Sequence, residues 1–423
     1  MIKIFKFGGA SVKDASAVRN LAEIVSDYTD YKLVVVISAM GKTTNAFENL
    51  LHSITENPSD SALILSEIRS YHFGIVNELF EDPEHQVQNE IETLFNEVIN
   101  LIRYNGTESY DKKYDQLVSY GELLSTTIVC GYLNSIGMKA GLLDARNVVK
   151  TDQTYRDAVI DWETTQNLIQ KTAHKLFSQT DIIITQGFIG SDQTGNTVTL
   201  GREGSDYTAA IFGYSLNASD VTIWKDVPGL LNADPKFYPE AVKLDMISYP
   251  EAIELAYYGA TVIHPKTIKP LENKQIPLFV KSFLQPHGSG SVIGKSNGTV
   301  PYIPSYIFKT RQVLISILPR DFSFIAEKNL QSIFGVFSQY NLSVNLMQNS
   351  AISFSVCVDY KPGKTQEVIA ELQKTYKVRY NENLWLITIR HYDQETIDRI
   401  LAGKRVLLEQ RSRSTVQFVV ETN

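Results

Sequence analysis

Cysteine is scarce in this chain, which has only Cys130 and Cys357 among its 423 residues. The two lie far apart and lack the short spacing of a metal site, so we expect neither a structural disulfide nor a cysteine-bound metal ion. Proteins without disulfides are typical of reducing compartments. The sequence therefore predicts a cytoplasmic location.

An excess of positive charge and long apolar runs are also missing. The formal net charge of -7 argues against a general nucleic-acid-binding protein. No uninterrupted apolar run reaches the roughly 18 residues that cross a bilayer. Lys3 and Lys6 interrupt the apolar segment that a signal peptide would need. We therefore expect a soluble protein whose partners include neither nucleic acid nor a membrane.

What is present is an alternation of strand-like and helical patterns, in a chain long enough for two or three domains. Continuous apolar runs at residues 32 to 38 and 181 to 185 are typical of strands buried on both faces. Strands that alternate with helices predict an α/β domain with a mostly parallel sheet. Ligands of such sheets bind at the carboxyl ends of the strands. The loops after Phe7, Ser38 and Thr185 are expected at that edge.

The first strand ends in a glycine pair, Gly8 and Gly9, and a helical pattern follows it. Two glycines at such a turn let the backbone approach a ligand closely, and the amides at a helix start favour an anion such as phosphate. Lys6 supplies a mobile cation for the same anion. The alternative is a tight turn with a solvated lysine, and this stretch alone does not favour either.

A second small-residue loop, Leu200-Gly-Arg-Glu-Gly-Ser-Asp206, precedes a helix expected over residues 207 to 214. Arg202 carries a planar fork that suits a carboxylate. Ser205 and Asp206 stand at the expected helix N-terminus, where Ser205 is predicted to cap the helix. The alternative is a capped helix beside a surface arginine.

Seven motifs together resemble those of the aspartate kinases, and they occur in that family's order. They are Lys6-Phe-Gly-Gly-Ala-Ser-Val12, Ser38-Ala-Met-Gly-Lys-Thr-Thr-Asn45, Gly121-Glu122, Gln186-Gly-Phe188, Leu200-Gly-Arg-Glu-Gly-Ser-Asp206, Trp224-Lys-Asp226 and Gly259-Ala-Thr-Val-Ile-His-Pro265. The resemblance implies the amino-acid-kinase fold, an eight-stranded, mainly parallel sheet between helical layers. It also implies transfer of the ATP γ-phosphoryl group to the side-chain carboxylate of L-aspartate. The product, 4-phospho-L-aspartate, is the first intermediate on the way to lysine, threonine, methionine and diaminopimelate.

The resemblance also assigns roles to residues on the aspartate and phosphate side. Lys6 is expected to contact the ATP phosphates and the transferring group, and Asp206 is expected to help order Lys6 and the metal-bound phosphates. Glu122 is expected to bind the ammonium of aspartate, and Arg202 its α-carboxylate. Further contacts are expected from Gly8 and Gly9 to the phosphates, and from Ser38, Thr44 and Ser205 to the substrate.

On the nucleotide side the chain departs from the family pattern. The positions that match nucleotide contacts are Lys225, Asp226, Leu231, Lys236, Thr261 and Val262. The departures are Ala10 for a common threonine, Glu203 for a frequent glycine, Lys225 for threonine, Leu231 for tyrosine and Thr261 for lysine. Three of these five substitutions lie among the nucleotide positions.

The implied chemistry needs no general base. A carboxylate nucleophile with a pKa of about 3.9 is already ionised at neutral pH. Catalysis then consists of positioning and of neutralising two anions that repel each other. Mg²⁺ is expected to arrive with the nucleotide, and no protein residue is predicted as a metal ligand. His264, which precedes Pro265, is expected to have a structural role.

A regulatory region is predicted after residue 300, where small and polar residues mark a boundary. The patterns that follow have the order strand, helix, strand, strand, helix, strand, which resembles an ACT domain, and the tail resembles a shortened second unit. The predicted domains are residues 1–300 (catalytic), 305–392 (ACT-like) and 393–423 (second ACT-like unit). An end-product amino acid is expected to bind there, lysine or threonine, with neither preferred because Asn345 stands where many lysine-inhibited relatives have aspartate. A homodimer is expected through the same region, with Phe334, Phe337, Leu346 and Met347 near the pairing surface.

Two other functions are weighed against this one. Another amino-acid kinase, for glutamate or acetylglutamate, would lack the pairing of Glu122 with Arg202 and the ACT units. A non-catalytic amino-acid-binding regulator would not need to keep Lys6, Glu122, Arg202 and Asp206 together. A fusion with homoserine dehydrogenase is not expected at this length.

Overall fold

The computed structural model describes residues 1–423 except for 57, 83, 105, 261–262, 296–302, 322 and 422–423. The chain forms two compact units. Unit 1 comprises Met1–Leu230, Lys243–Ile253 and Val262–Val300, and unit 2 comprises Leu231–Val242, Glu254–Thr261 and Pro301–Asn423. Two short segments before residue 300 thus belong to unit 2. The domain limits at residues 300, 305 and 392 stay predictions.

Unit 1 is built around an eight-stranded sheet in the order β10-β12-β11-β7-β1-β2-β4-β3. Its neighbouring strands are parallel except for β11 and β12, which confirms the expected mainly parallel sheet. Its strands are β1 (Ile2–Phe7), β2 (Lys32–Ile37), β3 (Ala140–Leu143), β4 (Ile182–Gln186), β7 (Asp220–Lys225), β10 (Met246–Ser248), β11 (Leu278–Ser282) and β12 (Ser291–Gly294). Four short strands lie outside it: β5 (Ile189–Ser191) and β6 (Thr197–Thr199), which form a hairpin, and β8 (Leu230–Leu231) and β9 (Lys243–Leu244).

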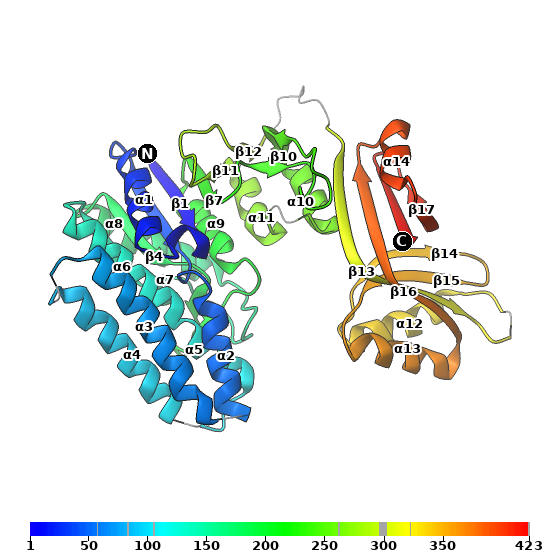
Figure 1. The fold of residues 1–423 in the computed structure, drawn as a ribbon, viewed down its shortest axis with the longest axis horizontal. Coiled ribbons are helices and arrows are strands. Elements are labelled where there is room, and N and C mark those ends of the chain that lie inside the picture. Colours follow the sequence, from blue (N-terminus) through cyan, green and yellow to red (C-terminus); the bar gives the residue numbers. More distant parts are fainter. Residues whose placement is uncertain are drawn as a thin grey trace. The chain divides into compact units, whose positions relative to one another are not determined.

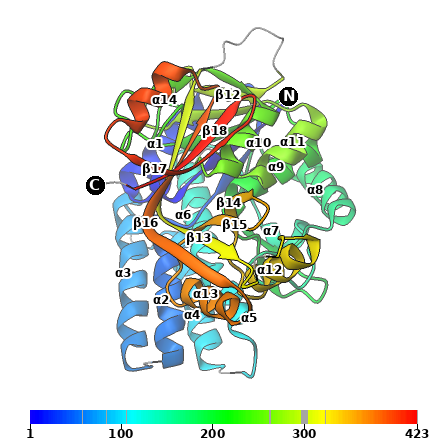
Figure 2. The same ribbon diagram turned by 90° about the vertical axis from the view of Figure 1, so that its right-hand side faces the viewer.

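Helices occupy most of the connections between these strands, and α2, α3 and α4 run beside one another in both views (Figures 1 and 2). The first helix begins at Ala15, where the Ala17 amide donates to the carboxylate of the N-cap residue Asp14 at 2.8 Å. The helices with residues in unit 1 are α1 (Ala15–Ser26), α2 (Thr43–Glu56), α3 (Ser61–Leu79), α4 (Gln86–Arg103), α5 (Tyr110–Val118), α6 (Tyr120–Ser135), α7 (Ala145–Val148), α8 (Trp162–Phe177), α9 (Gly204–Leu216), α10 (Tyr249–Tyr258) and α11 (Pro265–Lys274), with short 3₁₀ turns η1 (Gly9–Val12) and η2 (Pro58–Asp60).

The strand register brings the candidate loops to one edge of the sheet. Phe7 at the end of β1 pairs with Ile37 on one side and with Trp224 on the other. All three side chains are buried, and the rings of Phe7 and Trp224 stack with centroids 5.9 Å apart. This packing holds β1, β2 and β7 in register, so that the polar residues after each strand lie together.

Unit 2 contains a six-stranded sheet in the order β14-β15-β13-β16-β18-β17. Its two central strands each run over 14 residues. The sequence pattern predicts the last of the ACT-like strands over residues 385 to 390, and β16 begins eight residues earlier. The strands are β13 (Ser305–Leu318), β14 (Val344–Asn349), β15 (Phe354–Asp359), β16 (Lys377–Arg390), β17 (Arg405–Arg411) and β18 (Thr415–Glu421), and the helices are α12 (Glu327–Gln339), α13 (Lys364–Thr375) and α14 (Gln394–Leu401). The antiparallel sheet and the predicted order of elements agree with the expected ACT-like region.

Helices α12 and α13 lie side by side in Figure 2. They share a core with the sheet through Ile333 and Phe337 of α12 and Val368 of α13. Phe337 is therefore buried within this unit, and Leu346 is buried in a neighbouring cluster. These two side chains are thus covered within the chain itself, whereas Phe334 and Met347 are exposed. The position of all four residues near a pairing surface stays a prediction.

Among the residues that the structure describes, no helix has the length and apolar character needed to cross a membrane.

Candidate functional site

The strand ends of unit 1 enclose a cavity of about 340 Å³. Seven of its lining residues are site residues predicted from the sequence: Lys6, Ser38, Thr44, Glu122, Ser205, Asp206 and Lys225. Four further lining residues, which were not assigned a role, are Phe188, Gly201, Glu203 and Gly204. The cavity thus collects side chains from β1, β7, α2, α6 and α9, as the carboxyl edge of a parallel sheet predicts.

At one end of the cavity, two lysines approach one carboxylate. Lys6 Nζ lies 2.7 Å from Asp206 Oδ1, and Lys225 Nζ lies 3.8 Å from Asp206 Oδ2. Lys6 and Asp206 are buried, and Lys225 is half-buried. These three groups together carry one positive charge in a partly dry setting, where its attraction for an anion is stronger than in water. This end suits a phosphate.

Glu122 gives the cavity a different character. It lies in the first turn of α6 and is only 2% exposed. Its Oε1 accepts a hydrogen bond from the Ala39 amide at 3.3 Å, while Oε2 has no partner among the described residues. Burial raises the pKa of Glu122 to about 8, against the opposing effects of the Ala39 amide and the Lys6 charge. A buried carboxylate with an unused oxygen is a suitable partner for a ligand ammonium group.

The glycine pair after β1 has two different functions. A side chain at Gly8 would crowd the Lys6 ammonium, because its Cβ would lie 3.3 Å from Nζ. A Cβ at Gly9 would lie 2.6 Å from the Gly41 carbonyl oxygen and 2.8 Å from that of Ala39. Gly9 also accepts a hydrogen bond from the Gly41 amide. Gly9 therefore lets the two loops after β1 and β2 pack against each other, a reason that the sequence did not reveal.

The loop before α9 departs from the prediction. The helix begins at Gly204, three residues before the expected start. Its N-cap residue is Glu203, which makes no side-chain capping hydrogen bond, and Ser205 lies inside the first turn. The residue before the helix, Glu203, has a left-handed backbone with φ of 54°, a conformation that glycine adopts more readily than other residues. Its carboxylate accepts a hydrogen bond from the His264 amide at 2.9 Å. The predicted capping by Ser205 is wrong, although Ser205 lines the cavity.

A buried aspartate that the sequence analysis missed fixes the strand that precedes the loop before α9. Asp115 of α5 is fully buried and accepts hydrogen bonds from the Thr199 amide at 2.8 Å and the Thr199 hydroxyl at 2.7 Å. It also accepts from the Arg156 amide at 3.0 Å. Thr199 ends β6, two residues before Gly201, so Asp115 fixes the strand from which the cavity-lining loop starts. Its partners lie 41 and 84 residues away along the chain, which is why no local pattern could identify it.

The remaining predicted site residues lie elsewhere. Arg202 is exposed and stands between two lining residues without lining the cavity itself, and Asp226 is also exposed. Leu231 and Lys236 belong to unit 2. Thr261 and Val262 lie outside the described residues.

Two observations concern metal ions and His264. Within the described residues, no group of three or more His, Cys, Asp and Glu side chains is placed to hold a metal ion. His264 caps α11 by accepting from the Lys266 amide. Its ring nitrogen therefore caps the helix, which agrees with the structural role expected for His264.

Comparisons with known proteins agree with this geometry. Residues 1–282 match the model of the amino acid kinase family. The lysine-sensitive aspartokinase 3 of Escherichia coli strain K12 is 32% identical over 403 residues, which cover 92% of this chain and 86% of the relative. The crystal structure of E. coli aspartokinase III in complex with aspartate and ADP has a TM-score of 0.84 at 30% identity, covering 99% of this chain and 96% of that one. The structure of that enzyme with lysine and aspartate has a TM-score of 0.83 at 30% identity and the same coverage of 99% and 96%. The chain therefore belongs to the amino acid kinase family and, within it, to the aspartokinases.

Proposed function

We propose that this chain transfers the γ-phosphoryl group of ATP to the side-chain carboxylate of L-aspartate. The observation that carries the proposal is the pairing, in one cavity, of a buried carboxylate with an unused oxygen at Glu122 and a cationic end at Lys6 and Lys225. An amino acid with an ammonium group and an anionic nucleophile matches the first part, and a polyphosphate matches the second. Membership in the aspartokinases selects aspartate from the amino acids that satisfy this description.

The transfer requires no proton from the protein. A side-chain carboxylate oxygen of aspartate attacks the γ-phosphorus, the new oxygen–phosphorus bond forms, and the bond to the oxygen that bridges the β- and γ-phosphates breaks. ADP leaves with that oxygen and its electron pair. Lys6 neutralises the charge that the reacting phosphoryl oxygens carry, and Asp206 holds the Lys6 ammonium in place through their 2.7 Å contact.

Binding of the amino acid is assigned to Glu122 and Arg202. Glu122 receives the α-ammonium on its unused oxygen, and this contact favours the ionised carboxylate over the neutral form that burial favours in the empty cavity. Arg202 is exposed and belongs to the loop that lines the cavity through Gly201 and Glu203. We assign it to the α-carboxylate, with Ser38, Thr44 and Ser205 as further substrate contacts.

The nucleotide is ATP in this proposal. Lys225 and Asp226 at the end of β7 contact it, and Leu231, Lys236, Thr261 and Val262 are assigned to its nucleoside side. Mg²⁺ bound to the phosphates would neutralise part of their charge. Asp206 contacts both Lys6 and Lys225, and through these lysines it would help to order phosphates that carry Mg²⁺.

Regulation and assembly complete the proposal. An end-product amino acid binds to residues 305–423 and inhibits the kinase. Lysine is the first candidate to test, because the similar aspartokinase III was crystallised with lysine. Asn345 accepts from Lys309 Nζ and donates to Gln312 and Asp359, so it contributes no negative charge for a lysine ammonium, and threonine is the alternative. A homodimer through residues 305–423 is part of the same proposal, and β14 lies at one edge of the sheet in this region. A cytoplasmic location is also part of it.

The test is an assay in which hydroxylamine traps the acyl phosphate. Full-length protein with Mg-ATP should form hydroxamate with aspartate much faster than with glutamate or without an amino acid. Equal rates with all three would refute the proposal. The kinase activity is then measured with lysine and threonine, added separately and together, to identify the effector. Light scattering of the protein as it elutes from a size-exclusion column gives its mass and tests the dimer.

A further inference from the structure

The turn that carries Arg202 has an unusual backbone. It begins at Gly201 and is closed by a hydrogen bond from the Gly204 amide to the Gly201 carbonyl oxygen at 3.0 Å. Its third residue, Glu203, has φ of 54° and ψ of 29°. A positive φ at this position is characteristic of a type II turn, where glycine or asparagine is favoured. For a glutamate the left-handed conformation is strained, because Cβ comes too close to a carbonyl oxygen, and this disfavours it roughly 5- to 30-fold.

The side chain of Glu203 makes a contact that can offset this strain. Its carboxylate accepts a hydrogen bond from the His264 amide at 2.9 Å, and the residue is half-buried. A hydrogen bond to a charged group favours the bonded state roughly 10- to 150-fold, which is at least as large as the effect of the strain. The contact with His264, at the start of α11, is thus sufficient to hold Glu203 in its left-handed conformation.

A second contact links the start of α11 to the other end of the turn. Lys266 pairs with the carboxylate of Asp157, and a Cβ at Gly201 would lie 2.5 Å from Asp157 Oδ1. Because Asp157 is exposed, this ion pair favours the bonded state by about fivefold at most. The contact between Glu203 and His264 is therefore the stronger of the two links.

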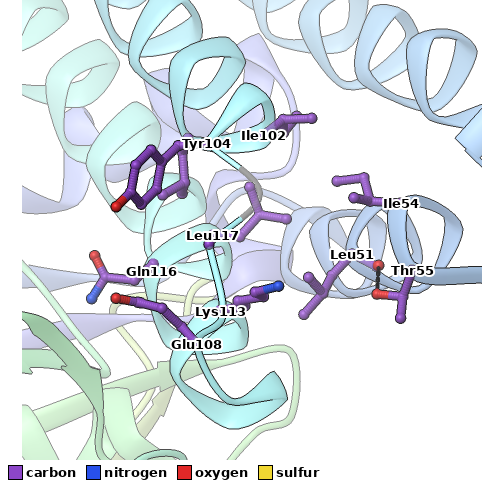
Figure 3. A pocket seen from close by; sticks show the side chains of 11 residues that line it. Leu51, Ile54, Thr55, Ile102, Tyr104, Glu108, Lys113, Gln116 and Leu117 are labelled. Atoms are coloured by element: carbon purple, nitrogen blue, oxygen red, sulfur yellow. Dashed lines mark hydrogen bonds between the residues drawn. The ribbon is translucent and has the colours of Figure 1, made fainter.

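The strand before the turn is held independently of Glu203. Asp115 of α5 binds Thr199 at the end of β6, and the neighbouring Gln116 donates its side-chain amide to the Thr197 carbonyl oxygen at 2.9 Å. Figure 3 shows Gln116 among the side chains around a hollow of about 270 Å³ that is bounded by α2, the end of α4 and α5. Helix α9 after the turn is mostly buried. Loss of the Glu203 contact should therefore change the turn itself and leave β6 and α9 in place.

Arg202 depends on the form of this turn. In the proposed reaction it contacts the α-carboxylate of aspartate, yet its side chain is exposed and does not line the cavity. The side chain must therefore rotate toward the ligand, and the backbone of the turn sets the direction from which it starts. In a type I turn, which has a negative φ at the third residue, the peptide between Arg202 and Glu203 is rotated by about half a turn. A change of turn type would thus alter the backbone on both sides of that peptide.

We propose that Glu203 is a positioning residue for Arg202. By accepting a hydrogen bond from the His264 amide, it keeps the turn in the form from which Arg202 reaches the α-carboxylate of aspartate. The inference rests on the proposed function, because it concerns how that substrate is held. Without the contact, strain at residue 203 shifts the turn toward the other form, and the apparent affinity for aspartate decreases with the fraction of molecules in the competent form.

Three substitutions at position 203 separate the contact from the conformation. Glu203→Ala keeps the strain and loses the contact, so its aspartate KM in the hydroxamate assay should rise roughly 5- to 30-fold with little change in kcat. Glu203→Gln keeps an oxygen that can accept from the His264 amide, and Glu203→Gly adopts a positive φ without strain, so both should stay within about threefold of the wild-type KM. A wild-type KM in Glu203→Ala, or equal impairment in Glu203→Gly and Glu203→Ala, would overturn the proposal.

A double substitution tests whether Glu203 acts through Arg202. Added to Arg202→Ala, Glu203→Ala should raise the aspartate KM by less than about twofold further, because the side chain that it positions is already gone. A further rise as large as the one in the wild-type background would show that Glu203 acts independently of Arg202, against the proposal. Glu272→Ala is the matched control, since Glu272 lies on α11 but does not line the cavity, and it should leave the KM unchanged.

Hydrogen exchange at His264 tests the contact without the reaction. The chain has only seven histidines, so NMR can follow the His264 amide in full-length protein labelled with ¹⁵N at histidine. This amide should exchange slowly in the wild type and in Glu203→Gln, and roughly 10-fold faster or more in Glu203→Ala and Glu203→Gly. Equal exchange in the wild type and Glu203→Ala would refute the contact. If the chain forms no aspartyl hydroxamate at all, the proposed function fails, and the exchange measurement still decides whether Glu203 holds the turn.

Discussion

Protonation of Glu122 should control how tightly the enzyme holds aspartate. In the empty cavity, burial raises the pKa of this carboxyl to about 8. Only the ionised form can pair with the ammonium of aspartate, so binding at lower pH must first remove a proton. Removing this proton costs about 1.4 kcal/mol of binding free energy for each pH unit below the pKa. The aspartate KM rises accordingly as the pH falls.

The expected size of the effect follows from the ionised fraction. With a pKa of about 8, this fraction rises from roughly 1% at pH 6 to about half at pH 8. The aspartate KM, measured at saturating Mg-ATP with the hydroxamate assay, should therefore fall roughly 50-fold over this range and level off above it. The stability of the empty protein should change as well. The folded state holds the Glu122 proton up to a higher pH than the unfolded chain, so this group stabilises the fold less as pH rises from about 4.5 to 8.

The Glu122→Gln variant is the control. It keeps the shape and the hydrogen-bonding oxygen but cannot ionise, so its aspartate KM should be high and nearly independent of pH between 6 and 8. A wild-type KM that stays flat over the same range, or a variant that keeps the wild-type slope, would show that Glu122 does not carry the ammonium contact.

Three further predictions concern the same unit. Lys6→Ala should lower kcat roughly 100-fold or more with a much smaller change in aspartate KM, because its charge is needed most when charge redistributes on the phosphoryl group, and steady-state kinetics that show the reverse would exclude this role. Arg202→Ala should raise the aspartate KM about 10- to 100-fold, the loss expected for a charge-assisted pair of about 1.5–3 kcal/mol, and an unchanged KM would remove Arg202 from the site. Gly9→Ala should lower Tm by several degrees, because its Cβ would lie 2.6 Å from the Gly41 carbonyl oxygen and overpacking costs about 1–3 kcal/mol. Gly74→Ala, on α3 with no atom within 4 Å of the added methyl group, is the matched control and should raise Tm slightly, so equal shifts in calorimetry would contradict the steric argument.

The sequence allowed the catalytic cavity to be predicted where its residues follow strands. Lys6, Ser38 and Lys225 lie at the ends of β1, β2 and β7, and a parallel sheet brings such ends together whatever its details are. Glu122 and Asp206 were located through motifs at helix starts. Each of these predictions depends on a local pattern.

Where the prediction failed, the residue pattern of the segment does not indicate its conformation or its burial. Helix α9 begins early because Glu203 adopts a left-handed backbone. This conformation is uncommon for a residue other than glycine, so the sequence gives no sign of it. The first half of β16 was missed because residues 377–383 are mostly exposed and polar, so they lack the alternation that marks a half-buried strand. The burial of Phe337 and Leu346 depends on which face of each element meets the rest of unit 2, which periodicity alone does not determine.

The two long central strands of unit 2 show what would happen to the sheet if the chain were divided at residue 392. β16 pairs through residues 377–381 with the end of β13 and through residues 384–390 with its start. Residues 385–390 of β16 also pair with β18. A chain cut at residue 392 would keep β16 but lose the partner on its outer side. The apolar stretch from Trp385 to Ile389 would then become a bare sheet edge, which invites pairing with other molecules. The two predicted ACT-like parts share strand pairs, so neither can form its part of the sheet without the other. Insertions or deletions should therefore be tolerated at the ends of this sheet and not between β16 and β18.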